Sequence, residues 1–452
     1  MKTMKNFLSM AALALMGAMM TGCSSDDNFD NPQQPENKSK VVTLTTTVGF
    51  DASAGTRALT STGVKTFAVN DQIAVIYTKN GGTVTKAVSE KLISTDIASG
   101  GKSATFTVTL DDPDKDQEVT YIYPAAMAGE TGVDLTKLNT QEGTFDALQS
   151  KYDLCTKSGA WNADNLPSLT LENQLAILAI TLKDNAATPS EITGGITSLT
   201  IGDGTNTYTV SRSAAAGPIY VAIRPTTSAK IKIYASDGSK YYNKNLTGKT
   251  YEADNGYSVS WKMPEALISN ATTADYGMVV CDAGHLHLAK TAVPGGCTAV
   301  GILGKVTATG HGLILALQDA ATSQTWNTIN GWDSETTYAG TTLKQLPAGA
   351  RSPLTSYTTL GSTAVSDWAV AQKSDYEEIF VNLGSAKHDP DGYTYDDYVN
   401  AYITTGVGGT AISDVCWSAT EYDGSVGWAF SSYYWNRSGK SSNRRLRPVL
   451  GF

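Results

Sequence analysis

The sequence predicts a mainly β protein, in which two antiparallel β-sandwiches are followed by an α+β domain. From residue 41 to residue 264 the chain consists of short β-branched and apolar runs, separated by turn residues such as Asn80-Gly81-Gly82. Beyond this region the composition changes: six of the eight tryptophans lie between Trp326 and Trp435, and a helix signal appears at Ser374. This change predicts a third domain of a different class.

The amino-terminal segment has the features of a secretory signal over residues 1–22. Lys2 and Lys5 precede an apolar run over residues 7–20, and the run ends at Met-Thr-Gly-Cys, whose cysteine is Cys23. The run is too short to cross a membrane as a helix. Its end resembles a bacterial lipobox, which implies that Cys23 is lipidated and that the mature protein is anchored in the outer membrane and faces the cell surface. The alternative is an ordinary cleaved signal with an incidental cysteine.

The first β-sandwich is predicted over residues 41–188 and the second over residues 189–265, with the boundary at Pro189. The run over 175–182 is apolar on both faces and should be a central strand. The strand-like runs of this half of the chain are 41–50, 72–78, 104–110, 119–123, 175–182, 196–201, 219–223 and 230–234.

The third domain is predicted over residues 271–452. It opens with β-like segments at 277–281, 285–289 and 299–307. Ser374 to Glu377 has the pattern of a capping box, which predicts a helix that ends at Gly384. The residues expected to face inward from this helix are Tyr376, Ile379, Phe380 and Leu383, and those from a second helix over 395–403 are Tyr398, Val399 and Tyr402.

Charge and cysteine content restrict the classes of partner. The net charge of −9 and the absence of a basic cluster argue against nucleic acid as a partner. Residues 23–40 are rich in Asn, Pro and Gln and are expected to form a flexible tether. After Cys23 the cysteines are Cys155, Cys281, Cys297 and Cys416, for which three pairings are open. Cys281 and Cys297 are close enough in the chain to form a bridge; four free buried thiols are the alternative.

Several motifs resemble the fimbrillin family, the pilins and pilus-associated proteins of Bacteroidota. They are the lipobox, Gly-Thr-Arg-Ala-Leu around Arg57, ENQLAILAITL over 172–182, IYVAIRP over 219–225 and YEADNGYSVSWKM over 251–263. The resemblance implies pilin-like sandwiches and cleavage after Arg57 by an arginine-specific protease. It also implies that a strand of another pilin subunit then fills the groove left by the first strand. A surface arginine in a loop is the alternative for Arg57.

The last residues have the composition of a recognition surface. Rigid aromatic residues alternate here with Ser, Gly, Asn and Asp. Trp417 and Trp428 are expected in the core because large aromatic side chains dominate packing. Tyr433, Tyr434 and Trp435 cannot all be buried on one strand face, since neighbouring side chains alternate. The arginines near residue 445 could bind an acidic ligand, although arginines beside a core strand more often make structural hydrogen bonds.

Three segments of this ending resemble the C-type lectin-like fold: 417–421, 428–430 and 445–449. Similar endings occur in the variable proteins of diversity-generating retroelements, in which the residues between such landmarks contact the ligand. By this resemblance the ligand-binding residues are Tyr422, Asp423, Ser431, Tyr433, Tyr434, Trp435, Asn436, Ser438, Lys440 and Asn443. The ligand itself, a glycan or a protein of a host or bacterial surface, is left open.

No catalytic or metal site is predicted. Gly100 to Ser103 is similar to a phosphate loop, but Asp96 stands where the first glycine is needed. His285 and His287 could form a metal pair, yet without an evident third ligand we expect two surface histidines. A calcium loop at 389–392 lacks further clustered ligands. The sequence shows no pattern of a nucleophile paired with a base, so we expect neither an enzyme nor a cofactor.

The sequence therefore favours a cell-surface lipoprotein adhesin at the tip of a pilus, which accepts a donor strand after cleavage at Arg57. In this hypothesis the carboxyl-terminal strand is committed to its own domain, so the subunit can accept a strand but cannot donate one. A structural or anchor pilus subunit without specific ligand binding is the alternative.

Overall fold

The computed structural model describes residues 40–50, 65–161, 164–294, 297–308, 310–320, 323–330, 344–345, 359–360, 363–364, 368–386 and 397–452. The predicted signal peptide, Cys23, the tether to residue 39, Arg57 and the loop at 389–392 lie outside the described residues. Residues from Val41 to Phe452 belong to one compact unit. No helix among the described residues is long and apolar enough to cross a membrane.

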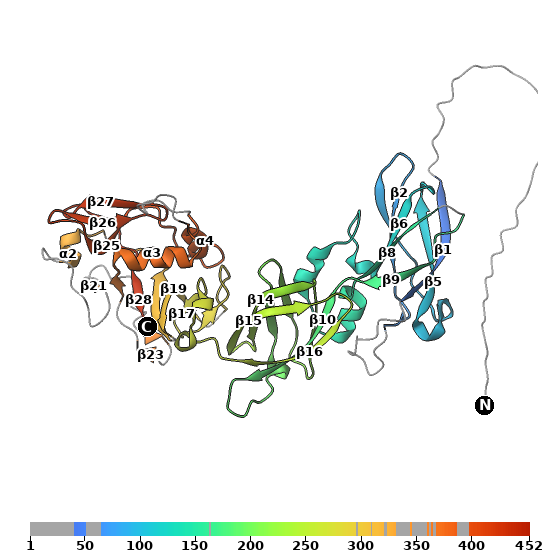
Figure 1. The fold of residues 1–452 in the computed structure, drawn as a ribbon, viewed down its shortest axis with the longest axis horizontal. Helices are drawn as coiled ribbons and strands as arrows, with labels where there is room; N and C mark the ends of the chain where they lie inside the picture. The colour runs from blue at the N-terminus through green and yellow to red at the C-terminus, as the bar shows by residue number, and fades with distance from the viewer. Residues whose placement is uncertain are drawn as a thin grey trace, which may run out of the picture. The chain divides into compact units, whose positions relative to one another are not determined.

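The amino-terminal sandwich is built from one eight-stranded sheet in the order β3-β2-β6-β8-β9-β1-β5-β4 (Figure 1). Its core includes Phe106, Tyr121 and Trp161, all nearly inaccessible to solvent. The strands are β1 (Val41–Phe50), β2 (Ala74–Thr78), β3 (Val84–Val88), β4 (Ile97–Ala98), β5 (Ser103–Asp111), β6 (Glu118–Tyr123), β8 (Cys155–Ala160) and β9 (Leu169–Asn173). The strands predicted in this region are therefore confirmed.

The first strand, β1, lies inside this sheet. It pairs antiparallel with β5, from Val41 opposite Asp111 to Gly49 opposite Ser103, and parallel with β9. Its even-numbered residues face the core and its odd-numbered residues face solvent, as the period of two in a strand requires. Val48 is fully buried, whereas Leu44 is only half-buried.

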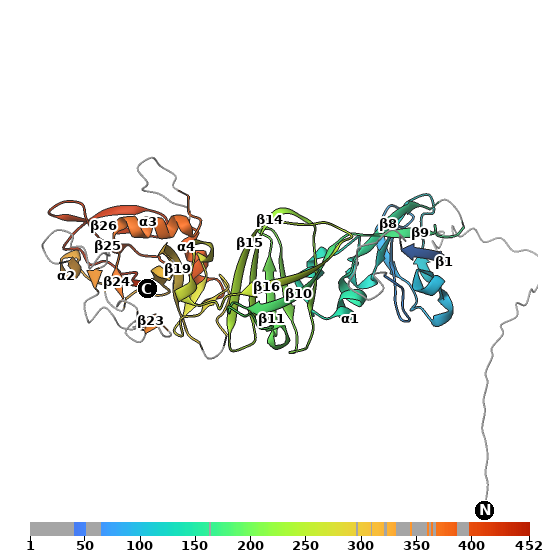
Figure 2. The ribbon, with the colours of Figure 1, turned by 60° about the horizontal axis from the view of Figure 1, so that its bottom comes forward.

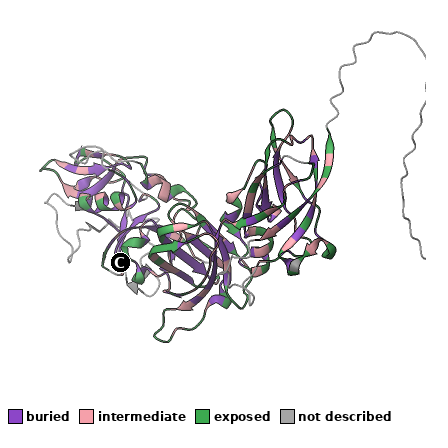
Figure 3. Ribbon diagram, turned by 45° about the vertical axis from the view of Figure 1, so that its right-hand side comes forward, coloured by how far each residue is buried: buried purple, intermediate pink, exposed green. Residues whose placement is uncertain are grey.

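The second sandwich packs a three-stranded sheet, β13-β10-β16, against a five-stranded sheet, β15-β14-β11-β12-β7. Figure 3 shows the buried strands of this core in purple. A short helix, α1 (Phe145–Ala147), precedes β8 in the chain. The strands are β7 (Thr140–Gln141), β10 (Ala176–Asp184), β11 (Ser198–Gly202), β12 (Thr207–Ser211), β13 (Ile219–Ile223), β14 (Thr226–Ser236), β15 (Tyr241–Tyr251) and β16 (Gly256–Met263).

The pairing of β10 corrects the predicted boundary at Pro189. β10 is central and buried on both faces, as its apolar sequence predicts. However, it pairs with β13 and β16, which lie beyond residue 189. Strand pairing joins residues far apart in the chain, so β10 and the earlier β7 both belong to the second sandwich, and no single boundary at residue 188 separates the sheets.

The carboxyl-terminal domain contains a seven-stranded sheet in the order β18-β17-β19-β20-β28-β24-β21. These strands are β17 (Val279–Cys281), β18 (Leu286–His287), β19 (Ala299–Ala308), β20 (His311–Ala316), β21 (Lys344–Gln345), β24 (Ala369–Val370) and β28 (Val449–Gly451). A second sheet joins β25 (Cys416–Glu421), β26 (Val426–Phe430) and β27 (Trp435–Gly439), and β22 (Thr359–Leu360) pairs with β23 (Thr363–Ala364).

Helix α3 (Lys373–Asn382) contacts both of the larger sheets of this domain (Figure 2). Its inward residues Tyr376, Ile379, Phe380 and Leu383 are all buried, as predicted. Gly304 of β19 leaves room for Ile379, since a Cβ there would lie 2.7 Å from this side chain. Gly384 ends the helix with φ +97°, a conformation that favours glycine.

Two details of the predicted helices are wrong. The N-cap of α3 is Gln372, so Ser374 lies inside the first turn and does not cap the helix. The second helix, α4 (Val399–Thr404), buries Val399 but leaves Tyr398, which precedes it, 52% exposed. Helix α2 (Trp326–Asn330) was not predicted.

Candidate ligand-binding site in the carboxyl-terminal domain

The three-stranded sheet β25-β26-β27 positions most of the predicted ligand-binding residues. In its register Trp428 lies opposite Arg437, and Phe430 lies opposite Trp435. These four residues therefore share one face of the sheet, because directly paired residues and residues two apart point the same way. The face has a buried half over α3 and an exposed half beyond it.

The buried half packs on helix α3. The ring of Phe430 lies 4.3 Å from that of Tyr376 and 5.3 Å from that of Trp435, measured between centroids. Trp435 is only 4% exposed. Contacts between aromatic rings at these distances stabilise the fold beyond the contribution from burying their apolar surface. Trp435 is therefore a core residue and not the contact residue that the sequence predicts.

The exposed half combines aromatic rings with cations. The Arg437 guanidinium lies 4.3 Å from the ring centroid of Tyr422 and 5.5 Å from that of Trp428. At the inner edge, Lys373 Nζ lies 4.9 Å from the Trp428 centroid. These distances are typical of cation–π interactions. Tyr422 is 46% exposed, Arg437 is exposed and Trp428 is half-buried. We call Tyr422, Trp428 and Arg437 the cation–aromatic face.

Asp423 shapes the turn beside this face. Its Oδ1 accepts hydrogen bonds from the backbone N–H groups of Ser425, at 2.7 Å, and Val426, at 2.8 Å, and from the Ser425 hydroxyl. These donors, with the backbone and hydroxyl of Ser425 first, lower the pKa of Asp423. Asp423 therefore has an evident structural role in the turn that carries Tyr422.

Of the ten predicted ligand-binding residues, six are exposed or half-buried and four are buried. The exposed or half-buried residues are Tyr422, Asp423, Tyr433, Tyr434, Asn436 and Asn443, and the buried ones are Ser431, Trp435, Ser438 and Lys440. Lys440 forms an ion pair with Glu421, and its Nζ lies 4.5 Å from the Trp326 ring centroid. Its charge is therefore used inside the domain, which corrects its assignment as a contact residue.

The exposed candidates do not form one platform. Tyr433 and Tyr434 lie in the β26–β27 turn, with ring centroids 4.9 Å apart. Tyr422 lies in the β25–β26 turn, at the other end of β26. A strand of this length separates its ends by about 17 Å. The sheet thus presents two separate aromatic groups, and among the described residues a cation lies over the one at Tyr422 and not over the one at Tyr433.

The sequence did not single out Arg437 or Lys373. Arg437 belongs to the face because the β26–β27 turn sets it opposite Trp428. A prediction of the hairpin register in this region could have identified it. Lys373 comes from the start of α3, far away in the chain. No local pattern connects it with Trp428.

Trp417 and Arg447 have structural roles, as expected for both. Trp417 is fully buried and donates from Nε1 to the Gln324 carbonyl at 2.9 Å. Arg447 is also fully buried; its Nε lies 2.9 Å from Asp319 Oδ1, and an Nη donates to the Thr410 carbonyl at 2.8 Å. Burial raises the pKa of Asp319, and the Arg447 charge opposes this shift. Neither residue is placed to bind a ligand.

The structure decides between the two alternatives left open for the cysteines and corrects the prediction for the histidines. Cys281 and Cys297 form a disulfide, and Cys155 and Cys416 are buried thiols outside it. His287 is 1% exposed, so the expected pair of surface histidines is wrong. Burial, with a smaller contribution from the charge of His285, lowers the pKa of His287 to about 4.

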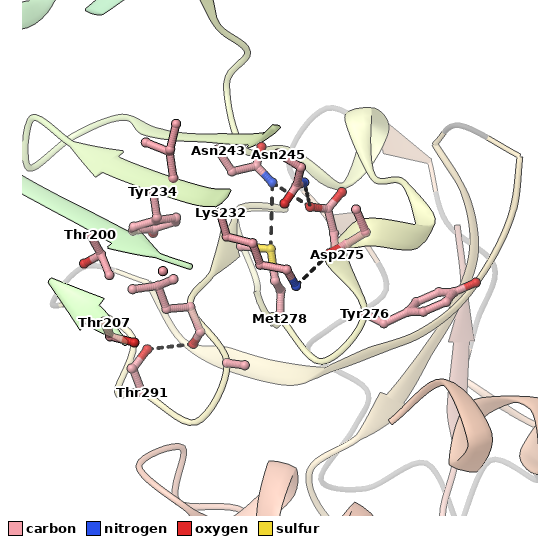
Figure 4. A pocket seen from close by; sticks show the side chains of 15 residues that line it. Thr200, Thr207, Lys232, Tyr234, Asn243, Asn245, Asp275, Tyr276, Met278 and Thr291 are labelled. Carbon is pink, nitrogen blue, oxygen red and sulfur yellow. Dashed lines mark hydrogen bonds between the residues drawn. The ribbon is translucent and has the colours of Figure 1, made fainter. Parts of the chain in front are cut away.

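A cavity of 280 Å³ lies between β14 and β15 of the second sandwich and the segment around Asp275 (Figure 4). Lys232 Nζ donates to the Ala274 carbonyl at 3.1 Å, and Asn243 Nδ2 donates to Asp275 Oδ1 at 2.9 Å. Met278 and Leu288 contribute apolar lining. The polar groups named here already bond to one another, so the cavity offers a ligand mainly apolar contacts.

No protein-family model matches the chain, and no curated protein matches it either. Among solved structures, a fimbrial assembly protein from Parabacteroides distasonis is 10% identical, with a TM-score of 0.27, over 49% of this chain and 90% of that chain. A protein assigned provisionally to cell adhesion, from Bacteroides uniformis, is 13% identical, with a TM-score of 0.28, over 49% of this chain and 94% of that chain. A variant of the major pilin of Streptococcus pyogenes is 10% identical, with a TM-score of 0.16, over 49% of this chain and 98% of that chain.

Proposed function

We propose that this protein is a lipid-anchored adhesin of the cell surface and the tip subunit of a pilus. It accepts a strand from a neighbouring subunit in its first sandwich and binds a surface ligand through its carboxyl-terminal domain. It acts by binding and not by catalysis. The observation that carries the proposal is the contrast between the first and last strands, each of which lies inside a sheet.

The first strand is suited to replacement. β1 precedes Arg57 in the chain, so cleavage there would leave it held only by non-covalent contacts. Its removal would expose the main-chain groups of β5 along nine paired positions and those of β9 along three. Exposed strand edges of this kind recruit a strand from another chain. The pockets of Val48, Phe50 and the buried Thr46 would select the side chains of the incoming strand.

The last strand is suited to retention. Val449 and Leu450 of β28 are fully buried, and the strand pairs with β20 on one side and β24 on the other. A strand committed in this way is not available to a second subunit. A subunit that accepts but does not donate a strand ends a polymer, which supports the tip position.

The cation–aromatic face supports ligand binding. Tyr and Trp rings offer flat apolar area with a polar edge, and Arg recognises carboxylates through a planar fork of donors. Together these groups suit an acidic ligand that also presents an apolar face, such as a glycan with carboxylates or an acidic protein segment. Aromatic residues and arginine are also the residue types most enriched at binding hot spots.

Strand exchange is tested with two forms of the protein, one beginning at Val41 and the other at Ala58, directly after Arg57. We expect the shorter form to bind a labelled peptide with the sequence of residues 41–50 and to gain thermal stability from it. The longer form, whose groove is filled, should bind no peptide. A folded shorter form that ignores the peptide would contradict the acceptor role.

Ligand binding is tested by screening residues 41–452 against acidic glycans and mucosal proteins. The Arg437→Ala and Tyr422→Ala variants should lose the binding, and Tyr433→Ala serves as a matched control from the other end of the sheet. Binding that survives both changes would place the site elsewhere. Absence of any binding by the folded protein would favour a structural or anchor subunit.

A further inference from the structure

The hairpin of β17 and β18 brings one cysteine and two histidines together. Val279 pairs with His287, and the backbone N–H of Cys281 donates to the His285 carbonyl at 3.1 Å. His285 and His287 are two residues apart on a strand-like segment and so project to the same side. The backbone pairing of the hairpin therefore places these three residues next to one another.

The same turn positions a second cysteine. The Asp282 N–H donates to the Thr298 carbonyl at 2.8 Å, and the Thr298 N–H donates to Asp282 Oδ1 at 2.9 Å. These two bonds hold Cys297, the preceding residue, against the hairpin. One ligand atom from each of Cys281, His285, His287 and Cys297 lies within 4.8 Å of the others.

The two sulfurs are bonded to each other in this structure, so a metal between them requires reduction; the distance between His287 and Cys297 is already close to that of a tetrahedral zinc site. Zinc–sulfur and zinc–nitrogen bonds of about 2.3 and 2.0 Å place neighbouring ligand atoms about 3.3–3.8 Å apart in a tetrahedron. His287 Nε2 lies 3.7 Å from Cys297 Sγ. The other ring nitrogen, Nδ1, lies 3.1 Å from the Tyr234 hydroxyl at a buried position. A hydrogen bond at the second nitrogen is what orients a histidine that binds a metal through the first.

Aromatic side chains of the second sandwich enclose the cluster. The Tyr241 ring lies 4.5 Å from that of His287 and 5.2 Å from that of His285, between centroids. Tyr241 is 5% exposed and Tyr234 is 9% exposed. This cover limits access of water to the cluster. It also places the four ligands where the hairpin meets β14 and β15.

We propose that Cys281, His285, His287 and Cys297 bind one Zn²⁺ ion when the two cysteines are reduced. Two thiols and two neutral imidazoles form one of the ligand sets typical of structural zinc. Binding converts both thiols to thiolates and releases two protons to solvent. The disulfide between Cys281 and Cys297 excludes the ion, because it removes both thiolate ligands. Zinc and the disulfide are therefore two alternative ways to close the same loop.

The test uses the protein of residues 41–452, reduced with a phosphine, which supplies the two electrons for the disulfide, and freed of metal with a chelator. Titration with Zn²⁺ should show one tightly bound ion per chain. Co²⁺ should give the visible bands of a tetrahedral site and thiolate-to-metal charge transfer. Oxidation to the disulfide by a two-electron oxidant such as oxidised glutathione, which accepts the electrons of the two thiolates, should release the ion. Failure of the folded, reduced protein to bind either metal would overturn the proposal.

Variants separate the metal site from the disulfide. His285→Gln should abolish the cobalt spectrum while still forming the disulfide, as thiol counting would show. Tyr234→Phe should weaken zinc binding by about 10–100-fold, since it removes the partner of Nδ1. His311→Gln, at an exposed position of β20, is the matched control and should change nothing. An unchanged cobalt spectrum in His285→Gln, or one zinc retained after Cys281→Ser/Cys297→Ser, would show adventitious binding and reject the site.

Discussion

The first and last strands of the described structure are both internal to a sheet, but they are held differently. β1 is ten residues long, and only alternate side chains are inward, with Val42 and Leu44 half-buried. β28 is three residues long, and all three are buried. The residue before Pro448, Arg447, is fully buried and paired with Asp319.

This difference is what the proposed function requires of an exchangeable strand, β1, and a permanent one, β28. The backbone pairs along β1 can be remade by any strand of suitable register, because main-chain hydrogen bonds carry little sequence information. The contacts of β28 are specific to its side chains and to a buried charge pair. In the proposed assembly, this contrast would set the direction in which strands are passed between subunits.

The largest effect is expected at Arg447. Its replacement in Arg447→Leu leaves the carboxylate of Asp319 without its buried partner, so the free energy of unfolding of the carboxyl-terminal domain should fall by about 3–5 kcal/mol. Arg445→Leu is the matched control, because the Arg445 side chain is 44% exposed and its Nε lies 3.7 Å from Asp414 Oδ2 in an exposed ion pair. Its loss should cost at most about 1 kcal/mol. Equal effects of the two changes in urea unfolding would contradict the anchoring of β28.

The two strands can be compared directly by the same substitution. Leu450→Ala in β28 should lower the free energy of unfolding by about 2–5 kcal/mol, because it empties a fully buried position. Leu44→Ala in β1 should cost less, because Leu44 is half-buried before the change. Chemical denaturation with probes in each domain measures both values. A larger cost at Leu44 would reverse the proposed order of strand retention.

The next effect concerns binding and not folding. Arg437→Ala should weaken binding of an acidic ligand by about 2 kcal/mol, or roughly 30-fold, if this face is a hot spot. Tyr433→Ala should change it by less than about 0.5 kcal/mol. Titration calorimetry with a ligand from the screen gives both numbers. A loss at Tyr433 alone would move the site to the β26–β27 turn.

Local patterns in the sequence predict the elements well but not their partners. The run over 219–223 coincides with β13, and the period of the inward residues predicts the buried face of α3. The boundary at Pro189 is wrong because β10 pairs with β16, more than seventy residues away. His287 is buried by Tyr234 and Tyr241 of the second sandwich. Arg437 becomes part of a face only through its register with Trp428. Each of these outcomes depends on a contact between segments that no local pattern links.

The smallest expected effect tests how the cation–aromatic face is supported. Hydrogen bonds from Ser425 and Val426 stabilise the ionised form of Asp423, so its pKa in the folded protein lies below the ordinary value. Its contribution to stability is therefore complete above the pKa of the unfolded chain and is lost as the pH falls through the lower folded value. An NMR titration of the Asp423 carboxyl carbon should give a midpoint below that of an aspartate in a disordered peptide. Asp423→Asn keeps an oxygen acceptor for the turn and should remove this pH dependence while leaving Tyr422 in place. A midpoint equal to that of the disordered peptide would mean that the hydrogen bonds of this turn do not stabilise the Asp423 carboxylate. The aromatic group at Tyr422 would then be no better supported than the one at Tyr433.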